Sequence, residues 1–240
     1  MSNTFVVVKK KHVIAAMTAF AVFLALSAFF ANLDFSETEP AVTEPEAHTL
    51  VIDAGHGGID GGAIGVDGSK ESDINLAISL RLQAVASFCG KNALMTRVDD
   101  SRGANALTYS EHDELVYRAD MVNSTPNAVL LSIHQNCYPT AQPSGAQVLY
   151  SSNGESEGFG VLTHTNLIKT LDPENRRVAE PDKNHLYILS NVKCPAILVE
   201  CGFVSNHSDI TKLTDSRYQT ALSTVLMASY LQFIRTNIQT

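Results

Sequence analysis

From residue 49 onward, short apolar segments alternate with longer segments whose apolar residues recur three or four positions apart. Segments 128–133 and 196–199 are almost continuously apolar. Such strands are typical of a buried, mostly parallel sheet. Strands that alternate with helices place helices over both faces of that sheet. The alternation therefore predicts an α/β fold with a covered, mostly parallel sheet.

The boundaries of the expected elements follow from the apolar spacing, from acidic first turns and from glycine stops. Gly90, for example, is a plausible end for the first helix. Helices are expected at 72–89, 110–122, 157–170 and 218–235, and strands at 49–53, 93–96, 128–133, 145–150 and 196–199, with a short strand at 186–189.

The N-terminal segment differs from the rest of the chain. Residues 1–12 contain a basic cluster, and residues 13–33 form a 21-residue run without a charged side chain. At about 1.5 Å per residue, a helix of that length crosses a bilayer. The run exceeds the roughly 7–15 apolar residues of a cleavable signal peptide. The sequence therefore predicts one N-terminal transmembrane helix that acts as an uncleaved signal anchor, with a signal peptide as the alternative.

The distribution of charge predicts which side of the membrane the remainder occupies. Lys9, Lys10 and Lys11 precede the apolar run, so the positive-inside rule places residues 1–12 in the cytoplasm. Residues 34–48 carry five acids and two prolines, which indicates a solvated linker. Residues 49–240 are then expected to form one domain outside the membrane.

Charge and cysteine content exclude several classes of protein. The chain carries −8 overall and its first 33 residues carry +3, so the remainder carries −11. Nucleic acid is therefore excluded as a partner, since phosphate contacts need clustered Lys and Arg. The four cysteines form no CxxC pair, which argues against a zinc ribbon or a redox site. We expect buried free thiols, and disulfides remain an alternative in an extracytoplasmic domain. The cysteines are Cys89, Cys137, Cys194 and Cys201.

Three polar motifs follow apolar strands. They are DAGHGGID at residues 53–60, SIHQN at 132–136 and VECGF at 199–203. Open α/β sheets place their sites at the carboxyl ends of strands, so we expect these motifs to meet. The first motif lacks the spacing of a P-loop or a dinucleotide fingerprint, and it holds a histidine between glycines instead.

Two histidines and one carboxylate fit the requirements of a catalytic zinc ion. His56 and His134 follow strands, and Glu71 starts the first expected helix. A catalytic zinc ion takes three protein ligands and keeps a fourth position open for water. Each residue also has an ordinary alternative. A histidine at a turn is often structural, and a carboxylate at a helix start stabilises the helix dipole by about 0.3–1 kcal/mol.

Glu200 directly follows the apolar segment 196–199. A carboxylate there is costly to desolvate unless it is paired or used in catalysis. Beside a metal site it could serve as a general base. The alternative is a salt-bridged core carboxylate. His112 is a rival metal ligand, although its place in an expected helix favours a surface position.

Together these motifs resemble the zinc-dependent N-acetylmuramoyl-L-alanine amidases, in their type 3 catalytic domain. The resemblance covers about residues 49–237. It rests on VIDAGHGGIDGGAIG, KESDINLAISL, MTRVDD, YRADMVNS, LSIHQN and AILVECGFVSN. It implies a mixed, roughly six-stranded sheet flanked by helices. It also implies one Zn2+ bound by His56, Glu71 and His134, with Glu200 as the catalytic acid/base.

The resemblance also implies a substrate and a location. The bond cleaved would join N-acetylmuramic acid to L-alanine in peptidoglycan. The segments SIHQNCYP and GAQVLYS are similar to those of membrane-anchored, germination-type amidases that prepare spore cortex. The expected partners are peptidoglycan, the membrane and an unidentified activator protein. The expected location is extracytoplasmic, at the cell wall or in the forespore intermembrane space.

Two further functions remain open from the sequence. One is another zinc peptidase, such as a carboxypeptidase, which needs an anchor for a terminal carboxylate. Arg97 is the candidate for that anchor, although its place in MTRVDD favours a structural role. Asn136 of the second motif is a second candidate for substrate contact. The other is a non-catalytic wall-binding module. A binding module has no need for the full set of candidate residues, which are His56, Glu71, His134 and Glu200.

Overall fold

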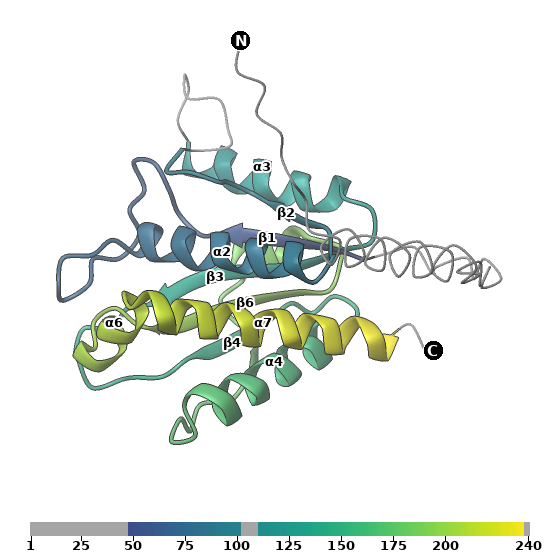
Figure 1. Cartoon of the computed structure of the whole chain (residues 1–240). Coiled ribbons are helices and arrows are strands. Elements are labelled where there is room, and N and C mark those ends of the chain that lie inside the picture. Colours follow the sequence, from purple (N-terminus) through teal and green to yellow (C-terminus); the bar gives the residue numbers. More distant parts are fainter. Residues whose placement is uncertain (1–47, 102–109, 238–240) are drawn as a thin grey trace, which may run out of the picture. The chain divides into compact units, whose positions relative to one another are not determined.

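The computed structural model describes residues 48–101 and 110–237 of the chain. Within these residues, six strands form one sheet in the order β2-β1-β3-β6-β4-β5 (Figure 1). The strands are β1 (Thr49–Ala54), β2 (Ala93–Met95), β3 (Ala128–Asn136), β4 (Gln147–Tyr150), β5 (Glu180–Pro181) and β6 (Ala196–Phe203). The helices are α2 (Glu71–Phe88), α3 (Glu111–Ser124), α4 (Ser156–Leu171), α5 (Tyr187–Asn191), α6 (His207–Leu213) and α7 (Ser216–Asn237).

The sheet is mixed. Strands β2, β1, β3 and β6 pair in parallel, whereas β4 is antiparallel to β6. The short β5 then pairs in parallel with β4. The expectation of a mixed, roughly six-stranded sheet is confirmed. The parallel strands carry their motifs to one edge, and β4 starts at that same edge because it runs the other way.

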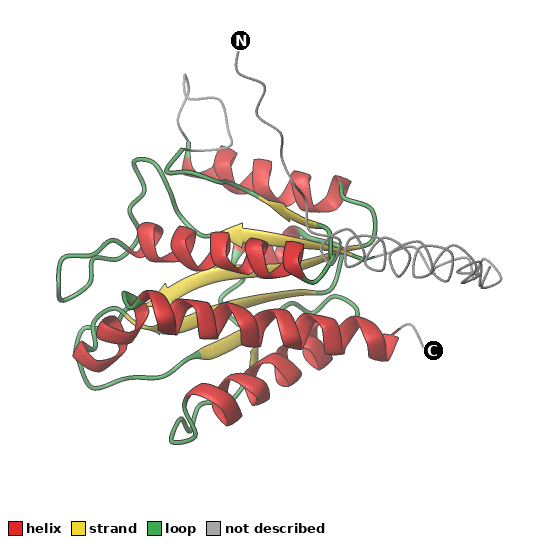
Figure 2. Cartoon of the chain, viewed as in Figure 1, coloured by secondary structure: helices red, strands yellow, loops and turns green. Residues whose placement is uncertain are grey.

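Helices cover both faces of the sheet, as expected (Figure 2). Helices α2, α4 and α7 pack on one face, where α7 contacts both of the others. Helices α3 and α5 pack on the opposite face. Neighbouring residues of β3 show the consequence. Leu131 enters the first core and Leu130 the second, and both are fully buried. Burial on both faces explains why this strand is continuously apolar.

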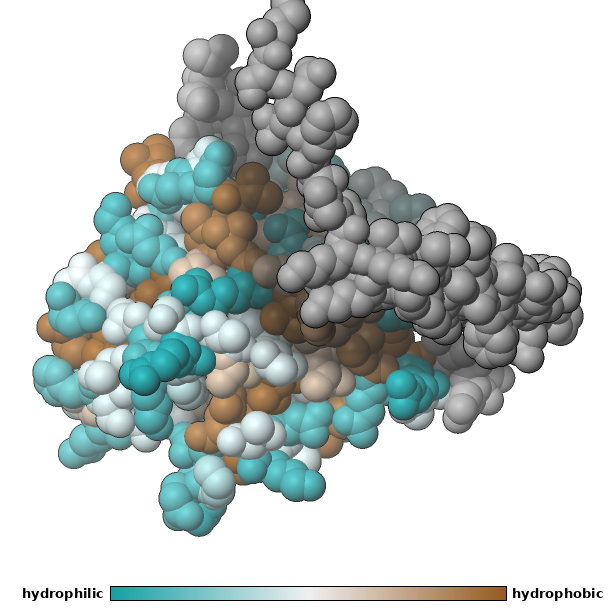
Figure 3. Space-filling model, viewed as in Figure 1, coloured by the Kyte–Doolittle hydropathy of each residue, from teal (hydrophilic) through white to brown (hydrophobic). Residues whose placement is uncertain are grey.

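Hydrophilic and hydrophobic residues are interspersed on the face of the domain seen in Figure 3, which α2 and α7 form. Leu80 and Phe88 of α2 are among the exposed apolar side chains. Scattered apolar residues of this kind are normal on a soluble surface. The apolar periodicity of these helices is therefore directed mainly at the sheet, as the sequence predicted.

One expected strand is wrong. Residues 186–189 were expected in a strand, but they lie at the start of helix α5. An apolar run of four residues does not distinguish strand from helix by its period. The Asp182 side chain accepts a hydrogen bond from the Leu186 backbone N–H, and the Asn191 side chain donates to the Tyr187 carbonyl. These local bonds favour the helical turn.

Two short elements were not expected. Strand β5 has only two residues, too few for a periodic signal. Helix α6 begins after Asn206, whose side chain accepts hydrogen bonds from the Ser208 and Asp209 backbone N–H groups. Asn is a strong N-cap residue, so the letters NHSD contained a signal for this helix.

The remaining expectations have mixed outcomes. The predicted anchor at residues 13–33 lies outside the described residues, and in the described part no helix is long and apolar enough to cross a bilayer.

All four cysteines are free thiols. The expectation that they are buried holds for Cys201, while Cys89 and Cys137 are exposed.

A buried charge network joins the end of β1 to α3. Arg118 of α3 lies 3.0 Å from both the Asp53 and the Glu114 carboxylates. Asp53 also accepts hydrogen bonds from the hydroxyls of Ser132 and Thr96 on the flanking strand and loop. Burial raises the pKa of Asp53, but the guanidinium and these hydroxyls outweigh it and hold the pKa below its usual value.

The same guanidinium also positions the first motif. Arg118 donates to the carbonyl oxygens of Ala54 and His56, at 2.8 and 2.7 Å. His56 has a positive φ of 60°, a conformation that a non-glycine residue adopts only when its surroundings hold it. Arg118 therefore stabilises both the buried Asp53 and the turn that carries His56.

Replacing Arg118 tests how much this buried network contributes to the free energy of unfolding. Arg118→Met removes the partner of two carboxylates, and breaking a buried ion pair costs about 3–5 kcal/mol in the free energy of unfolding. Arg217→Met is the matched control, because Arg217 is exposed and its pair with Asp215 contributes about 0–1 kcal/mol. Urea denaturation measures both values. Equal losses in the two variants would contradict a stabilising role for the buried network.

Candidate functional site

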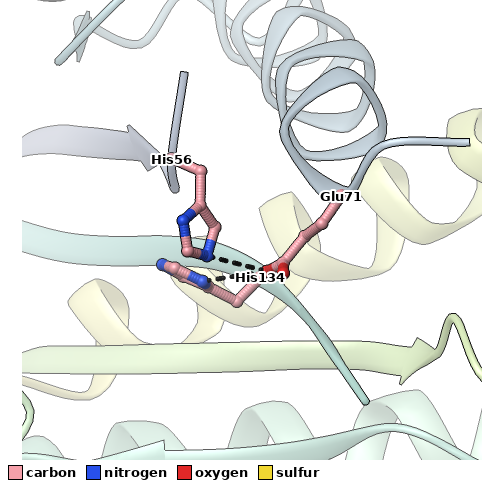
Figure 4. A group of neighbouring side chains, drawn as sticks. All are labelled: His56, Glu71 and His134. Carbon is pink, nitrogen blue, oxygen red and sulfur yellow. Dashed lines mark hydrogen bonds and ion pairs between the residues drawn. The ribbon is translucent and has the colours of Figure 1, made fainter. Parts of the chain in front are cut away.

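The three motifs meet at the carboxyl edge of the parallel strands. His134 lies in β3 directly beside Glu200 of β6, and His56 lies in the turn after β1. Glu71 is the first residue of α2, where the helix begins next to that turn. Figure 4 shows Glu71 directed from the start of α2 toward the two imidazole rings. Segments separated by more than sixty residues therefore converge on one point.

The ligand atoms of His56, Glu71 and His134 form a tight group. Glu71 Oε1 lies 3.3 Å from His56 Nε2 and 3.1 Å from His134 Nδ1. The three donor atoms all lie within 4.8 Å of one another. In the described part of the chain, this is the group whose His and carboxylate atoms are close enough to share one metal ion.

Glycines of the first motif make room for these side chains. A Cβ at Gly55 would lie 2.2 Å from His134 Nε2, which is an impossible contact. A Cβ at Gly62 would lie 2.7 Å from Glu71 Oε2, and the φ of Gly62 is +64°. Space alone requires glycine at position 55, whereas both space and a positive φ favour it at position 62. The glycine-rich turn is thus shaped around the candidate ligands.

A second set of contacts orients the ligands. His56 Nδ1 donates to Asp60 Oδ2 at 2.7 Å, which leaves Nε2 directed at Glu71. The Glu71 carboxylate accepts from the backbone N–H groups of Ala63 and Gln135, both at 3.0 Å. Carboxylates and backbone groups that hold a ligand in this way are common around protein metal sites.

The electrostatics of the group favour a positive charge. Burial lowers the pKa of His56, but the carboxylates of Glu71 and Asp60 outweigh it and raise the pKa to about 9. Burial raises the pKa of Glu71, yet the two imidazoles hold it well below its usual value. Two imidazoles and one buried carboxylate are also a donor set that zinc prefers. The residues present therefore fit a zinc ion.

Glu200 lies beside this group without belonging to it. Its Oε2 atom is buried and has no hydrogen-bond partner among the described residues. Burial raises the pKa of Glu200 to about 7, with a smaller lowering effect from His134 and a raising effect from Glu71. No ion pair within the described residues involves Glu200, so the alternative of a salt-bridged core carboxylate is not observed.

A small cavity adjoins the group on the side of α3. It has a volume of about 80 Å³ and lies next to His56 and His134. Glu111 and Glu114 of α3 and Ile188 of α5 form its far wall. Space for a substrate group therefore exists on the side where α3 covers the sheet.

Arg97 does not occupy the place expected of a substrate anchor. Only 4% of Arg97 is exposed. Its guanidinium donates to the carbonyl oxygens of Ala54, Gly55, Ser72 and Asp99. These bonds direct the guanidinium into the protein, which supports the structural alternative for MTRVDD, and contact of Arg97 with substrate stays a prediction. The side chain braces the turn after β1 against the start of α2.

Two other candidates have clear positions. Asn136 ends β3, where its carbonyl accepts from the Val204 N–H, and its contact with substrate stays a prediction. His112 is exposed on α3 with its ring against Tyr187, away from the candidate ligands. Its expected surface position is confirmed.

Several residues around the site were not singled out from the sequence. Asn75 and Gln135 are buried polar residues that bond to each other, and Asn75 also donates to the Gly55 carbonyl. Polar side chains inside otherwise apolar elements were the available signal, since such groups need partners. Asp60, four residues after His56, and Arg118 gave no comparable local signal.

Comparison with known proteins agrees with this arrangement. Residues 50–229 match the profile of the N-acetylmuramoyl-L-alanine amidase family known as Amidase_3. A germination-specific N-acetylmuramoyl-L-alanine amidase of Bacillus subtilis is 29% identical over 189 residues, which cover 77% of this chain and 78% of the relative.

Solved structures give the same result. The CwlD amidase from Clostridioides difficile, in complex with the GerS lipoprotein, is 30% identical with a TM-score of 0.74, and the match covers 79% of this chain and 99% of that one. An N-acetylmuramoyl-L-alanine amidase from Clostridium difficile 630 is 27% identical with a TM-score of 0.69, covering 79% and 97%. The resemblance drawn from the motifs is confirmed, and the chain belongs to the Amidase_3 family of N-acetylmuramoyl-L-alanine amidases.

Proposed function

We propose that this chain hydrolyses the amide bond between N-acetylmuramic acid and L-alanine in peptidoglycan, with one zinc ion held by His56, Glu71 and His134. The observation that carries the proposal is the buried Oε2 atom of Glu200, which has no hydrogen-bond partner among the described residues and lies beside that three-residue group. Family membership supports the class of reaction and the substrate.

Glu200 is the proposed general acid and base. A zinc ion, when bound, polarises a carbonyl and lowers the pKa of a water molecule toward about 7. Glu200 Oε2 has no competing hydrogen bond among the described residues, so it is available to take a proton from the attacking water. As the carbon–nitrogen bond breaks, Glu200 returns that proton to the leaving amine of L-alanine. Burial also raises the pKa of Glu200 to about 7, so this carboxylate accepts a proton more readily than an exposed one.

The rest of the site keeps these groups in place. Asp60 holds the Nδ1 proton of His56 and so directs Nε2 toward the ligand group. Arg97 and Arg118 hold the backbone of the turn through its carbonyl oxygens. Since Arg97 is used in this way, it offers no anchor for the carboxypeptidase alternative.

The biological setting is also part of the proposal. The germination-specific name of the Bacillus subtilis relative supports a role in spore cortex. The Clostridioides difficile relative was solved in complex with a lipoprotein, which supports the expectation of an activator protein for this chain. Peptidoglycan lies outside the cytoplasmic membrane, so residues 49–240 would act there as the catalytic domain.

Zinc content tests the ligand assignment. We expect one zinc ion per chain, and His56→Ala or His134→Ala should lose it because each removes one of three protein ligands. His112→Ala is the matched control and should keep its zinc, since His112 lies on the surface of α3. Elemental analysis of the purified proteins measures the ratio. Full zinc in both ligand variants would show that other residues bind the metal.

Glu200→Gln tests catalysis separately from metal binding. The variant keeps the size of the side chain but cannot carry the proton, so turnover should fall by about 10²–10⁴ while zinc is retained. Glu71→Gln should lose zinc as well as turnover, because Glu71 is a ligand. Glu157→Gln, on the exposed side of α4, is the control and should stay active. Product release is measured beside metal content. Near-normal turnover in zinc-loaded Glu200→Gln would exclude this role.

We also propose that residues 13–33 anchor the chain in the membrane, with residues 34–48 as a tether. The support is the 21-residue uncharged run after Lys9, Lys10 and Lys11. Protease added to protoplasts should then remove the amidase domain from a full-length chain. Recovery of a soluble mature form that starts near residue 28 would instead indicate a cleaved signal peptide.

A further inference from the structure

A row of polar side chains crosses three strands at the edge of the sheet. Glu200 of β6 pairs with His134 of β3 on one side and with Gln147 of β4 on the other. Residues directly opposite each other in neighbouring strands point to the same face of a sheet. Gln147 is therefore the next side chain in the row, on the side of Glu200 that is away from the candidate metal ligands.

Arg177 continues this row beyond β4. Its Nη1 donates to Gln147 Oε1 and its Nε donates to the Ser144 carbonyl, both at 3.0 Å. Its Cζ lies 4.5 Å from the ring centroid of Phe203, three residues after Glu200. A guanidinium stacked on a ring and bonded at two nitrogens has one orientation.

The backbone around Arg177 is held as firmly as its side chain. The Asn175 side chain donates to the Ala146 carbonyl and accepts from the Arg177 N–H, at 2.8 and 2.9 Å. The Arg177 carbonyl lies 2.8 Å from Nε2 of the buried His164. The position of this guanidinium is thus fixed by the fold, and it is not a free surface arginine.

Arg177 has no acidic partner within the described residues, unlike three other arginines of the domain. Arg118, Arg176 and Arg217 each form an ion pair with a carboxylate. Arg97 is surrounded by four carbonyl oxygens. Arg177 is half-buried, and its Nη2 donates to no described group. An ordered, unpaired cation beside the site of an acidic protein is suited to an anion from outside.

Resting on the proposed function, we propose that Arg177, oriented by Gln147, binds a carboxylate of the stem peptide on the far side of Glu200. Neighbouring strands lie about 4.8 Å apart, so the row extends on the order of 10 Å from His134. Two extended residues span about 7 Å, which lets the second stem residue reach the guanidinium when the scissile carbonyl lies near His134 and Glu200. The ligand assigned to Arg177 is therefore a free carboxylate on the second stem residue.

The proposal assigns Arg177 a specificity that Arg97 cannot provide. The Nη2 group and the second hydrogen of Nη1 can bind a carboxylate through two parallel N–H···O bonds, whereas a carboxamide offers one acceptor and no charge. The enzyme should therefore distinguish acid from amide at the second stem residue. This direction also orients the substrate, because the peptide runs toward β4 and the sugar lies on the other side of the scissile bond.

The test compares two glycan fragments that differ only in a carboxylate or a carboxamide at the second stem residue. A hydrogen-bonded charge pair changes kcat/KM by about ten- to a hundredfold, so the wild-type enzyme should prefer the acid by that factor, mainly through KM. Arg177→Gln should bring the ratio of the two kcat/KM values close to one. Arg177→Lys keeps the charge without the fork and should give an intermediate ratio.

Arg176→Gln is the matched control. Arg176 is the neighbouring exposed arginine and already pairs with Glu174, so the ratio should stay at the wild-type value. A ratio is insensitive to partial unfolding, because unfolded protein lowers both rates equally. Equal wild-type rates on the two fragments, or a preference that persists in both Arg177 variants, would overturn the assignment of Arg177 alone. Failure of the wild-type enzyme to cleave either fragment would overturn the proposed function and this assignment together.

Discussion

The parallel pairing of β1, β3 and β6 is the constraint on which the candidate site depends. Parallel strands end at the same edge of a sheet, so each brings its terminal residues to one place. Here that edge receives His56 after β1, His134 in β3 and Glu200 in β6. Glu71 joins them because α2 begins where the turn after β1 ends. Apolar packing on both faces aligns the strands, and the polar motifs converge as a consequence.

The turn after β1 has an unusual backbone conformation that the neighbouring side chains stabilise. His56 has a positive φ, and glycines at 55 and 62 leave space for the neighbouring ligands. Arg97 and Arg118 donate to carbonyl oxygens of this turn. Arg118 also balances Asp53, which burial would otherwise protonate more readily. Buried guanidinium groups therefore contribute to the geometry of the site through the backbone, and this contribution couples the stability of the fold to the position of His56.

The sequence was sufficient for the parts of the structure that repeat a local pattern. Continuous apolar runs predicted five of the strands, because these strands are buried on both faces. Apolar residues at helical spacing predicted the four longer helices. Residues His56, Glu71 and His134 were identifiable since each stands at a strand end or helix start. The short α5 and β5 were missed or mistaken because a few residues carry no period. The partners of Arg97 could not be predicted, because its bonds run to carbonyl oxygens of Ala54, Gly55 and Ser72, contacts that no local pattern reports.

The change of direction at β4 accounts for what lies beyond Glu200. In an all-parallel sheet the strand next to β6 would end at the site and its following loop would lead away. Because β4 is antiparallel, it starts at the site with Gln147 opposite Glu200. Strand β5 then runs parallel to β4, so the residues just before it, including Arg177, also lie at this edge. The candidate site therefore contains two kinds of residue. Some lie at the carboxyl ends of the parallel strands, and others lie at or just before the starts of β4 and β5. One side of Glu200 holds the candidate metal ligands, and the other holds an ordered guanidinium.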